Sequence, residues 1–189
     1  MRSRISLGLS LAGLLLVCTR CGGGGPTAPP QPSMSISFTA AAATAPSITL
    51  TEVSKTPTSI TVAVNANSVT DLFGVGFDLV WNPAFLHYQS AAEGSFLRAA
   101  GIATAFTAEL VDVEPGPGED RQQGRLAIGV GRLNAVPGVS GSGQLATVTF
   151  TSVASGTTGM SFEAIQPFDS TGTRITAMSF AGGTFTVRR

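Results

Sequence analysis

A hydrophobic period of two, broken at short intervals by turn residues, constrains the fold of this chain more than any other feature. Ile60, Val62 and Val64 alternate with Thr61 and Asn65, which places one set of side chains on each face of a β-strand. The same alternation recurs along the chain, at Val75, Phe77, Leu79 and Trp81, at Leu126, Ile128 and Val130, at Val148 and Phe150, at Met160 and Phe162, and at Phe185 and Val187. Clusters of Gly, Pro and Ser separate these runs. The sequence therefore predicts a single, mostly antiparallel all-β sandwich or barrel, with one helical turn near residues 95–100.

The N-terminal segment has the pattern of an export signal. Arg2 and Arg4 precede a short apolar run over residues 7–17, which is shorter than the about 20 residues that a membrane-spanning helix needs. Leu-Leu-Val-Cys, ending at Cys18, resembles a bacterial lipobox, in which the cysteine is acylated after cleavage. Cys21, directly before a glycine run, is the second candidate for the lipid anchor. We therefore expect an exported envelope protein, held at a membrane through a lipid anchor only. A secreted protein without the lipid is the alternative.

Composition divides the chain into three parts. Residues 1–21 form the signal peptide and lipobox region, and residues 22–46, rich in Gly, Pro and Ala, are expected to be a flexible tether. Residues 47–189 carry the alternating pattern and form the expected domain. No cysteine follows Cys21, so this domain is expected to have no disulfide and no cysteine-bound metal.

The distribution of charge excludes one class of partner. Arg2, Arg4 and Arg20 stand in the first 32 residues, where no acidic residue occurs. The rest of the chain holds all 11 acidic residues and 8 of the 11 basic ones, which gives it a net charge of −3. Nucleic-acid binding requires a basic surface that neutralises phosphates, so we expect no nucleic-acid partner.

Four segments, in order along the predicted domain, resemble the cohesin modules. The first, VAVNANSVTDLFGVGFDLVWNPAFLHY over residues 62–88, contains an alternating strand, a Gly-containing turn and a strand ending in Trp-Asn-Pro. The others are EGSFL at 93–97, GSGQLATVTF at 141–150 and FAGGTFTV at 180–187. The resemblance implies a nine-stranded antiparallel jelly-roll β-sandwich, related in fold to some carbohydrate-binding modules.

The same resemblance implies a role in docking a protein partner. Typical cohesins bind the calcium-loaded dockerin modules of polysaccharide-degrading enzymes through one flat sheet face, using polar residues early in the strand that here ends at Trp81. The matching positions are Gly74 and Gly76, which carry no side chain that could hydrogen-bond. The partner is therefore expected to be a dockerin-bearing enzyme or another envelope protein. Further candidates for the contact patch are the outward-facing charged residues Asp78, Glu109, Arg125 and Arg132.

No pattern in the sequence indicates catalysis, and we expect neither an enzyme nor a bound cofactor or metal. The single histidine, His87, follows a turn and is expected at the surface. The acidic residues Asp112, Glu114, Glu119 and Asp120 surround a Pro/Gly loop that could hold calcium, although their spacing fits no EF-hand and an exposed acidic loop is the simpler interpretation. Direct polysaccharide binding is the alternative function, but Trp81 shares the inward parity of Phe77 and is expected in the core.

Overall fold

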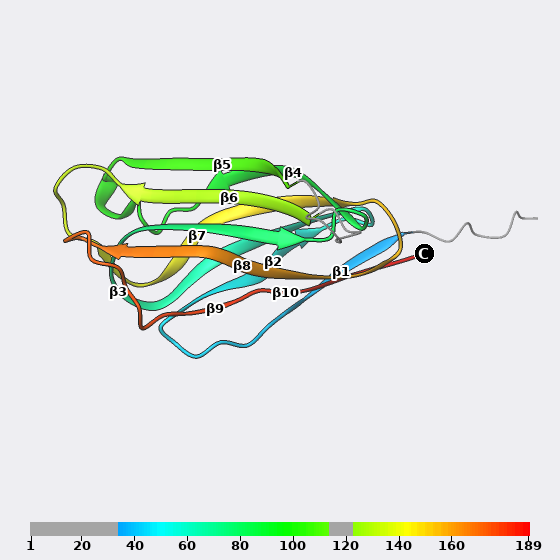
Figure 1. Ribbon diagram of the computed structural model, residues 1–189, viewed down its shortest axis with the longest axis horizontal. Helices are drawn as coiled ribbons and strands as arrows, with labels where there is room; N and C mark the ends of the chain where they lie inside the picture. Colours follow the sequence, from blue (N-terminus) through cyan, green and yellow to red (C-terminus); the bar gives the residue numbers. More distant parts are fainter. Residues whose placement is uncertain (1–33, 114–122) are drawn as a thin grey trace, which may run out of the picture. The chain divides into compact units, whose positions relative to one another are not determined.

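The computed structural model describes residues 34–113 and 123–189, and in these residues the chain is built almost wholly of strands (Figure 1). The described strands are β1 (Ser35–Ala40), β2 (Ser47–Lys55), β3 (Ser59–Trp81), β4 (Leu86–Glu93), β5 (Thr104–Val113), β6 (Gln123–Arg132), β7 (Val139–Ser152), β8 (Gly156–Asp169), β9 (Ser179–Ala181) and β10 (Gly183–Arg188). A 3₁₀ turn, η1 (Ala99–Gly101), lies at the end of the segment where a helical turn was predicted. In the same residues, no helix is long and apolar enough to cross a bilayer.

The long strand β3 belongs to two layers, and this makes the molecule a sandwich. Its first half pairs with β2 and β7, and its second half pairs with β6 and β8, in each case antiparallel. Between the halves, Ser68 and Asp71 each have a φ of 50°, and the register with β7 shifts. A left-handed residue and an irregular ladder bend a strand. The bend transfers β3 from one layer to the other, where the sequence predicted two separate strands.

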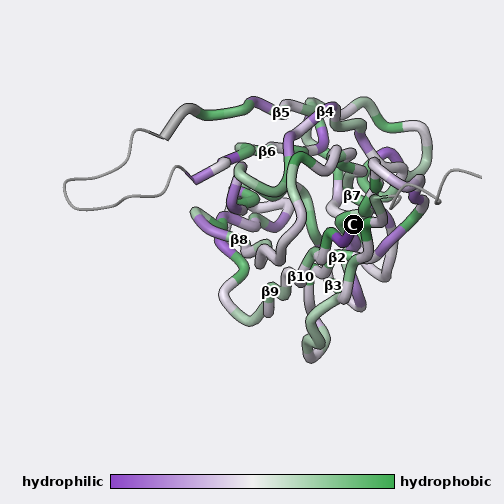
Figure 2. The backbone as a smooth tube through the Cα atoms, turned by 90° about the vertical axis from the view of Figure 1, so that its right-hand side faces the viewer, coloured by the Kyte–Doolittle hydropathy of each residue, from purple (hydrophilic) through white to green (hydrophobic). Residues whose placement is uncertain are grey.

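Each layer follows from these pairings. The first layer has the order β9-β2-β3-β7-β4, and the second has the order β1-β10-β8-β3-β6-β5. The pair of β2 and β9 is parallel. Figure 2, seen along the strands, places β6 and β8 on one side and β7 on the other. The predicted all-β sandwich is confirmed. The described ranges hold ten strands where the resemblance implied nine, and one of them, β9, has only three residues.

Inward side chains of the two layers meet in one apolar core. Trp81 on β3 lies 5.1 Å from Phe150 on β7, measured between ring centres, and Phe150 lies 5.9 Å from Phe185 on β10. Trp81 is only 4% exposed, and its indole Nε1–H donates to the carbonyl oxygen of Leu86 at 2.8 Å. Burial of each such side chain stabilises the fold by roughly 1.5–3 kcal/mol. The prediction that Trp81 belongs to the core is confirmed.

The domain begins earlier than the alternating pattern indicated. The composition of residues 22–46 predicted a tether, but β1 starts at Ser35 and pairs with β10 over its whole length. Ile36 is buried, and Phe38 packs 4.7 Å from Phe185 between ring centres. Ser, Thr and Ala surround these two apolar residues, so their alternation was too weak to detect against the low-complexity background. The start at residue 47 is therefore corrected to the start of β1.

Candidate functional site

The outward residues of β8, β3, β6 and β5 form the surface that we call the outer face. On β3, Val75, Phe77 and Leu79 are buried, so strand alternation turns the residues between them outward. The ladders align the outward residues in rows across the four strands. In the order β8, β3, β6 and β5, these rows are Phe168, Gly74, Gly131 and Ala105; Gln166, Gly76, Gly129 and Thr107; and Glu163, Asp78, Ala127 and Glu109.

Four glycines stand together at the centre of the first two rows. Gly74 pairs with Gly131, and Gly76 pairs with Gly129. A Cβ atom added at Gly74 would lie 3.3 Å from the Cα of Gly131, whereas one added at Gly76 would meet nothing closer than the carbonyl oxygen of Ile128 at 4.0 Å. Close packing therefore accounts for a glycine at 74 and does not account for one at 76. The result is a patch of bare backbone in the middle of a sheet.

The glycine patch is the floor of an open hollow with a volume of about 520 Å³, which we call the glycine hollow. Phe168 and the turn that follows β8 line one side, and Ala105 and Thr107 on β5 line the other. Phe73, at the bend of β3, also contributes to the lining. The hollow is thus bordered by the side chain of Phe168 and by small side chains, and it is open to solvent.

Asp71, at the bend of β3, fixes the turn that borders the hollow. Its carboxylate accepts hydrogen bonds from the Ser170 hydroxyl at 2.7 Å and from the Gly138 N–H at 2.8 Å. The Ser170 hydroxyl is the main cause of the lowered pKa of Asp71, and the two backbone N–H bonds add to it. We call Asp71, Gly138 and Ser170 the Asp71 clamp. It ties β3 to the loop before β7 and to the turn after β8.

The turn after β8 has a second carboxylate at its centre. Asp169 accepts hydrogen bonds from the Thr171 hydroxyl at 2.7 Å and from the Thr171 and Thr173 N–H groups, each at 2.9 Å. The Thr171 hydroxyl is the main cause of its lowered pKa. An aspartate whose side chain hydrogen-bonds to backbone N–H groups shortly after it is typical of a tight turn. Asp71 and Asp169 are therefore ionised at neutral pH beside the hollow.

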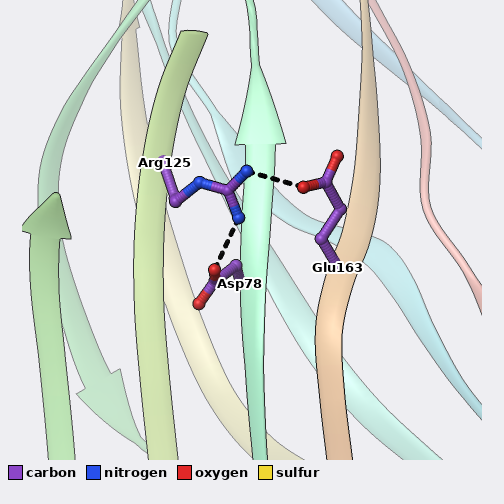
Figure 3. A network of polar contacts seen from close by, with 3 residues as sticks. All are labelled: Asp78, Arg125 and Glu163. Carbon is purple, nitrogen blue, oxygen red and sulfur yellow. Dashed lines mark hydrogen bonds and ion pairs between the residues drawn. The ribbon is translucent and has the colours of Figure 1, made fainter. Parts of the chain in front are cut away.

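Arg125 on β6 bridges two carboxylates at the other end of the outer face (Figure 3). Its Nη1 lies 2.6 Å from Oδ2 of Asp78 on β3, and its Nη2 lies 2.6 Å from Oε2 of Glu163 on β8. These bonds, with that to Asp78 first, raise the pKa of Arg125 above its ordinary value. The bridge spans three adjacent strands and leaves one negative charge in excess.

The whole described domain matches one known family. The family described as Cohesin domain matches residues 36–187. This chain belongs to the cohesin domain family. The matched range begins within β1, in agreement with the corrected start of the domain. No curated protein sequence gives a significant match to the chain.

Solved cohesin structures share the fold at low sequence identity. The non-cellulosomal cohesin from the archaeon Archaeoglobus fulgidus is 18% identical, with a TM-score of 0.50 over 79% of this chain and 88% of that one. The second type II cohesin module from the adaptor ScaA scaffoldin of Acetivibrio cellulolyticus is 14% identical, with a TM-score of 0.55 over 82% and 90%. A type II cohesin–X-dockerin complex from Acetivibrio cellulolyticus gives 16% identity and a TM-score of 0.53 over 72% of this chain and 93% of that one.

In this cohesin domain, the structure brings most of the predicted contact residues together. Gly74 and Gly76 form half of the glycine patch, and Asp78 and Arg125 form an ion pair beside it. Glu109 is exposed on β5, in the same row as Asp78. Their part in binding a partner stays a prediction. Cys18 and Cys21, and the acidic loop at 114–120, lie outside the described residues.

Arg132 does not lie on the outer face, and that expectation was wrong. It is 8% exposed, and its Nη1 and Nη2 atoms donate to the carbonyl oxygens of Leu97 and Ala99 at 3.0 and 3.4 Å. Its parity along β6 is that of Ile128 and Val130, so strand alternation turns it inward. The carbonyls stabilise the buried guanidinium, although its Nε has no hydrogen-bond partner. Arg132 therefore anchors the turn around η1.

Sequence reasoning missed Asp71, Glu163 and Phe168. Asp71 and Glu163 act through partners on other strands, and no local pattern shows those contacts. Phe168 had a detectable signal, because it directly precedes Asp169, the aspartate that leads the turn after β8. His87 is exposed on β4, in the opposite layer to the outer face. Among residues 34–113 and 123–189, no three His, Cys, Asp or Glu side chains gather closely enough to hold a metal ion.

Proposed function

We propose that this cohesin domain is a non-catalytic docking module that binds a protein partner through the outer face of β8, β3, β6 and β5. The observation that carries the proposal is the combination of family membership with this face, where bare backbone and an ordered ion-pair network lie side by side. A four-stranded surface with few protruding side chains allows close approach of a partner element. Fixed charges around it would set the orientation of that element.

The proposed partner is a dockerin-bearing protein, in the setting of polysaccharide degradation. A type II cohesin of the same fold has been solved with an X-dockerin pair, which supports this class of partner. Gly74 and Gly76 offer no side-chain hydrogen bonds where typical cohesins have polar residues, so the partner would differ in its contact surface. Another envelope protein is the second candidate within the same docking role.

We also propose export and lipid anchoring for this protein. The charged start, the short apolar run and the lipobox-like sequence before Cys18 support it, and Cys21 remains the second candidate. Growth of an expressing bacterium with radiolabelled palmitate, followed by electrophoresis of Cys18→Ser and Cys21→Ser variants, would identify the acylated cysteine. Equal labelling of the wild type and of a variant that carries both substitutions would contradict the proposal.

The docking proposal is tested by binding of the immobilised full chain to purified dockerin modules in calcium. We expect retention that is lost when a chelator removes calcium from the dockerin. Gly76→Arg places a long cation on the outer face and should abolish retention. His87→Arg, which adds the same group to the opposite layer, should leave retention unchanged. Equal loss in both variants, or no dockerin bound by the wild type, would contradict docking through this face.

Polysaccharide binding is the alternative function, and a second assay separates it from docking. Sugar-binding sandwiches commonly stack sugar rings on exposed aromatics, but Trp81 is 4% exposed and packs against Phe150. Sedimentation of the full chain with insoluble cellulose provides the comparison. Retention on cellulose together with failure to bind any dockerin would favour the alternative function.

A further inference from the structure

Packing within the chain does not require a glycine at every position on the floor of the glycine hollow. Cβ atoms at Gly76 and Gly131 would have their nearest contacts at 4.0 and 3.7 Å, which are ordinary van der Waals distances. Glycine within a strand also stabilises the fold less than alanine does, because it has more conformational freedom to lose. Two of the four glycines therefore leave open a space that the fold could have filled without strain.

The aromatic rings beside the hollow are not explained by the core either. Phe168 and Phe73 are half-buried, and both line the hollow. Neither belongs to the hydrophobic core or to the half-buried residues packed against it. Phe168 pairs with Gly74 and shares its outward parity, so its ring presents apolar surface to whatever enters the hollow. Covering that ring would remove this surface from water.

The border of the hollow is held in place before any partner arrives. Ser170, on the turn beside Phe168, donates to Asp71 through its hydroxyl at 2.7 Å and through its N–H at 3.3 Å. The turn is also closed by the N–H of Gly172, which donates to the carbonyl oxygen of Asp169 at 3.0 Å. A preorganised border reduces the ordering cost of binding.

The charged side chains around the hollow indicate which charge a binding partner should carry. Asp71 and Asp169 are ionised beside it, and Glu109 is exposed on the neighbouring strand. Asp78 and Glu163 share the single cation of Arg125. Arg174, opposite Phe168, donates a hydrogen bond from its Nη2 to the carbonyl oxygen of Ile165 at 2.6 Å. Carboxylates therefore outnumber cations on this surface, which complements a basic partner.

We propose that the glycine hollow is a socket for one protruding apolar side chain of the docked protein, aromatic or leucine, carried beside a lysine or arginine. This inference rests on the proposed docking function and names the chemistry of the partner. The apolar side chain would cover Phe168 and lie on the glycine floor. The adjacent cation would face the carboxylates of Asp71 and Asp169. Recognition at this point is then by shape and charge rather than by side-chain hydrogen bonds from β3.

The first test uses short peptides as probes and the amide signals of the four glycines as reporters. The ¹⁵N-labelled full chain is titrated with a capped peptide that has a tryptophan between two lysines, and then with peptides in which alanine replaces the tryptophan or glutamates replace the lysines. We expect saturable shifts at Gly74, Gly76, Gly129 and Gly131 with the first peptide. Each replacement should weaken binding, by about tenfold or more for the alanine peptide. Equal binding of the alanine peptide, or no saturable shift at these glycines, would overturn the socket.

The second test fills the socket and leaves the rest of the face intact. Gly76→Leu should lower the affinity for the tryptophan peptide by about tenfold or more, and Gly76→Ala should lower it by a smaller factor. Gly159→Leu is the matched control, because Gly159 is exposed on β8 away from the hollow and a Cβ there meets nothing within 4 Å. Thermal unfolding of each variant checks that the fold is kept. Unchanged affinity in both Gly76 variants would overturn the proposal.

The two proposals fail in different ways. A dockerin that binds wild type and Gly76→Leu equally would overturn the socket and leave docking in place. Saturable peptide binding at the glycines, with no dockerin or envelope protein retained, would support the socket and contradict the docking function. Glycine shifts caused by a cello-oligosaccharide but not by the peptide would overturn the socket in favour of a sugar.

Discussion

Asp71 accepts a hydrogen bond from the hydroxyl of Ser170 at 2.7 Å, and this contact joins residues that lie 99 positions apart in the chain. Asp71 stands where β3 bends from one layer into the other, and its φ of 50° turns its backbone into the left-handed region. Aspartate tolerates this conformation better than most residues. The same residue therefore makes the bend of β3 and holds the border of the glycine hollow.

The Asp71 clamp should weaken in acid. The pKa values of Asp71 and Asp169 are lowered in the folded chain, so the unfolded chain binds protons more readily. Their stabilisation is therefore present above about pH 4 and is lost as the pH falls through the folded-state pKa. We expect the melting temperature of Asp71→Asn to fall less steeply with acid than that of the wild type. Parallel melting curves from about pH 2 to pH 7 would contradict this expectation.

Removal of Arg125 should cost more stability than removal of a more exposed arginine. Arg125→Met leaves Asp78 and Glu163 close together without their cation, and we expect the free energy of unfolding to fall by about 1 kcal/mol. Arg98, with 62% of its side chain exposed and 3.8 Å from Glu93, is the control. Arg98→Met should change the value by less than about 0.5 kcal/mol. Urea denaturation measures the free energy of unfolding of both variants. Equal losses would show that the bridge of Arg125 adds no stability beyond that of an exposed ion pair.

Two strand glycines should respond to alanine with opposite signs. A Cβ at Gly124 would lie 2.5 Å from the indole of Trp81, whereas one at Gly159 meets nothing within 4 Å. Gly124→Ala should therefore lower the free energy of unfolding by about 1–3 kcal/mol, because it overpacks the core. Gly159→Ala should raise it by about 0.5–1 kcal/mol. Chemical denaturation of both variants decides the matter, and a stabilised Gly124→Ala would refute the packing described around Trp81.

The fluorescence of Trp81 should not respond to added sugars. As the single tryptophan of the chain, it alone determines the indole fluorescence. Its 4% exposure predicts blue-shifted emission that acrylamide quenches poorly and that oligosaccharides leave unchanged. Trp81→Phe should also lower the free energy of unfolding by about 1–3 kcal/mol, since the carbonyl of Leu86 loses its donor. Emission that shifts on addition of a sugar would contradict the burial of this ring.

The period-two pattern predicted the sandwich because alternation reports directly on which face of a strand is buried. It placed Trp81 and Phe77 in the core and Asp78 outside it. Arg132 was misplaced although its parity matched that of Val130, because its charge outweighed the pattern. The start at Ser35 was missed because only Ile36 and Phe38 carry the apolar alternation of β1.

The candidate site was less accessible to sequence reasoning, because it depends on contacts between distant strands. Gly74 and Gly76 were identified through a family resemblance, but their pairing with Gly131 and Gly129 requires the register of β3 and β6. The link of Arg125 to Glu163 likewise depends on β3 lying between β6 and β8. One sequence contains no direct record of such registers.

The pairing of β1 with β10 has a mechanical consequence. Ser35 lies opposite Arg188, and Val187 lies opposite Gly156 at the start of β8, whereas Phe168 lies near its other end. The entry of the chain into the domain and the glycine hollow are therefore separated by most of the length of β8, roughly 40 Å. Drag on a docked partner, resisted by a tether at Ser35, would pull along the strands. Because ladder hydrogen bonds lie across the strand direction, such a load would be shared by the whole β1–β10 ladder in shear and would not peel its bonds apart singly.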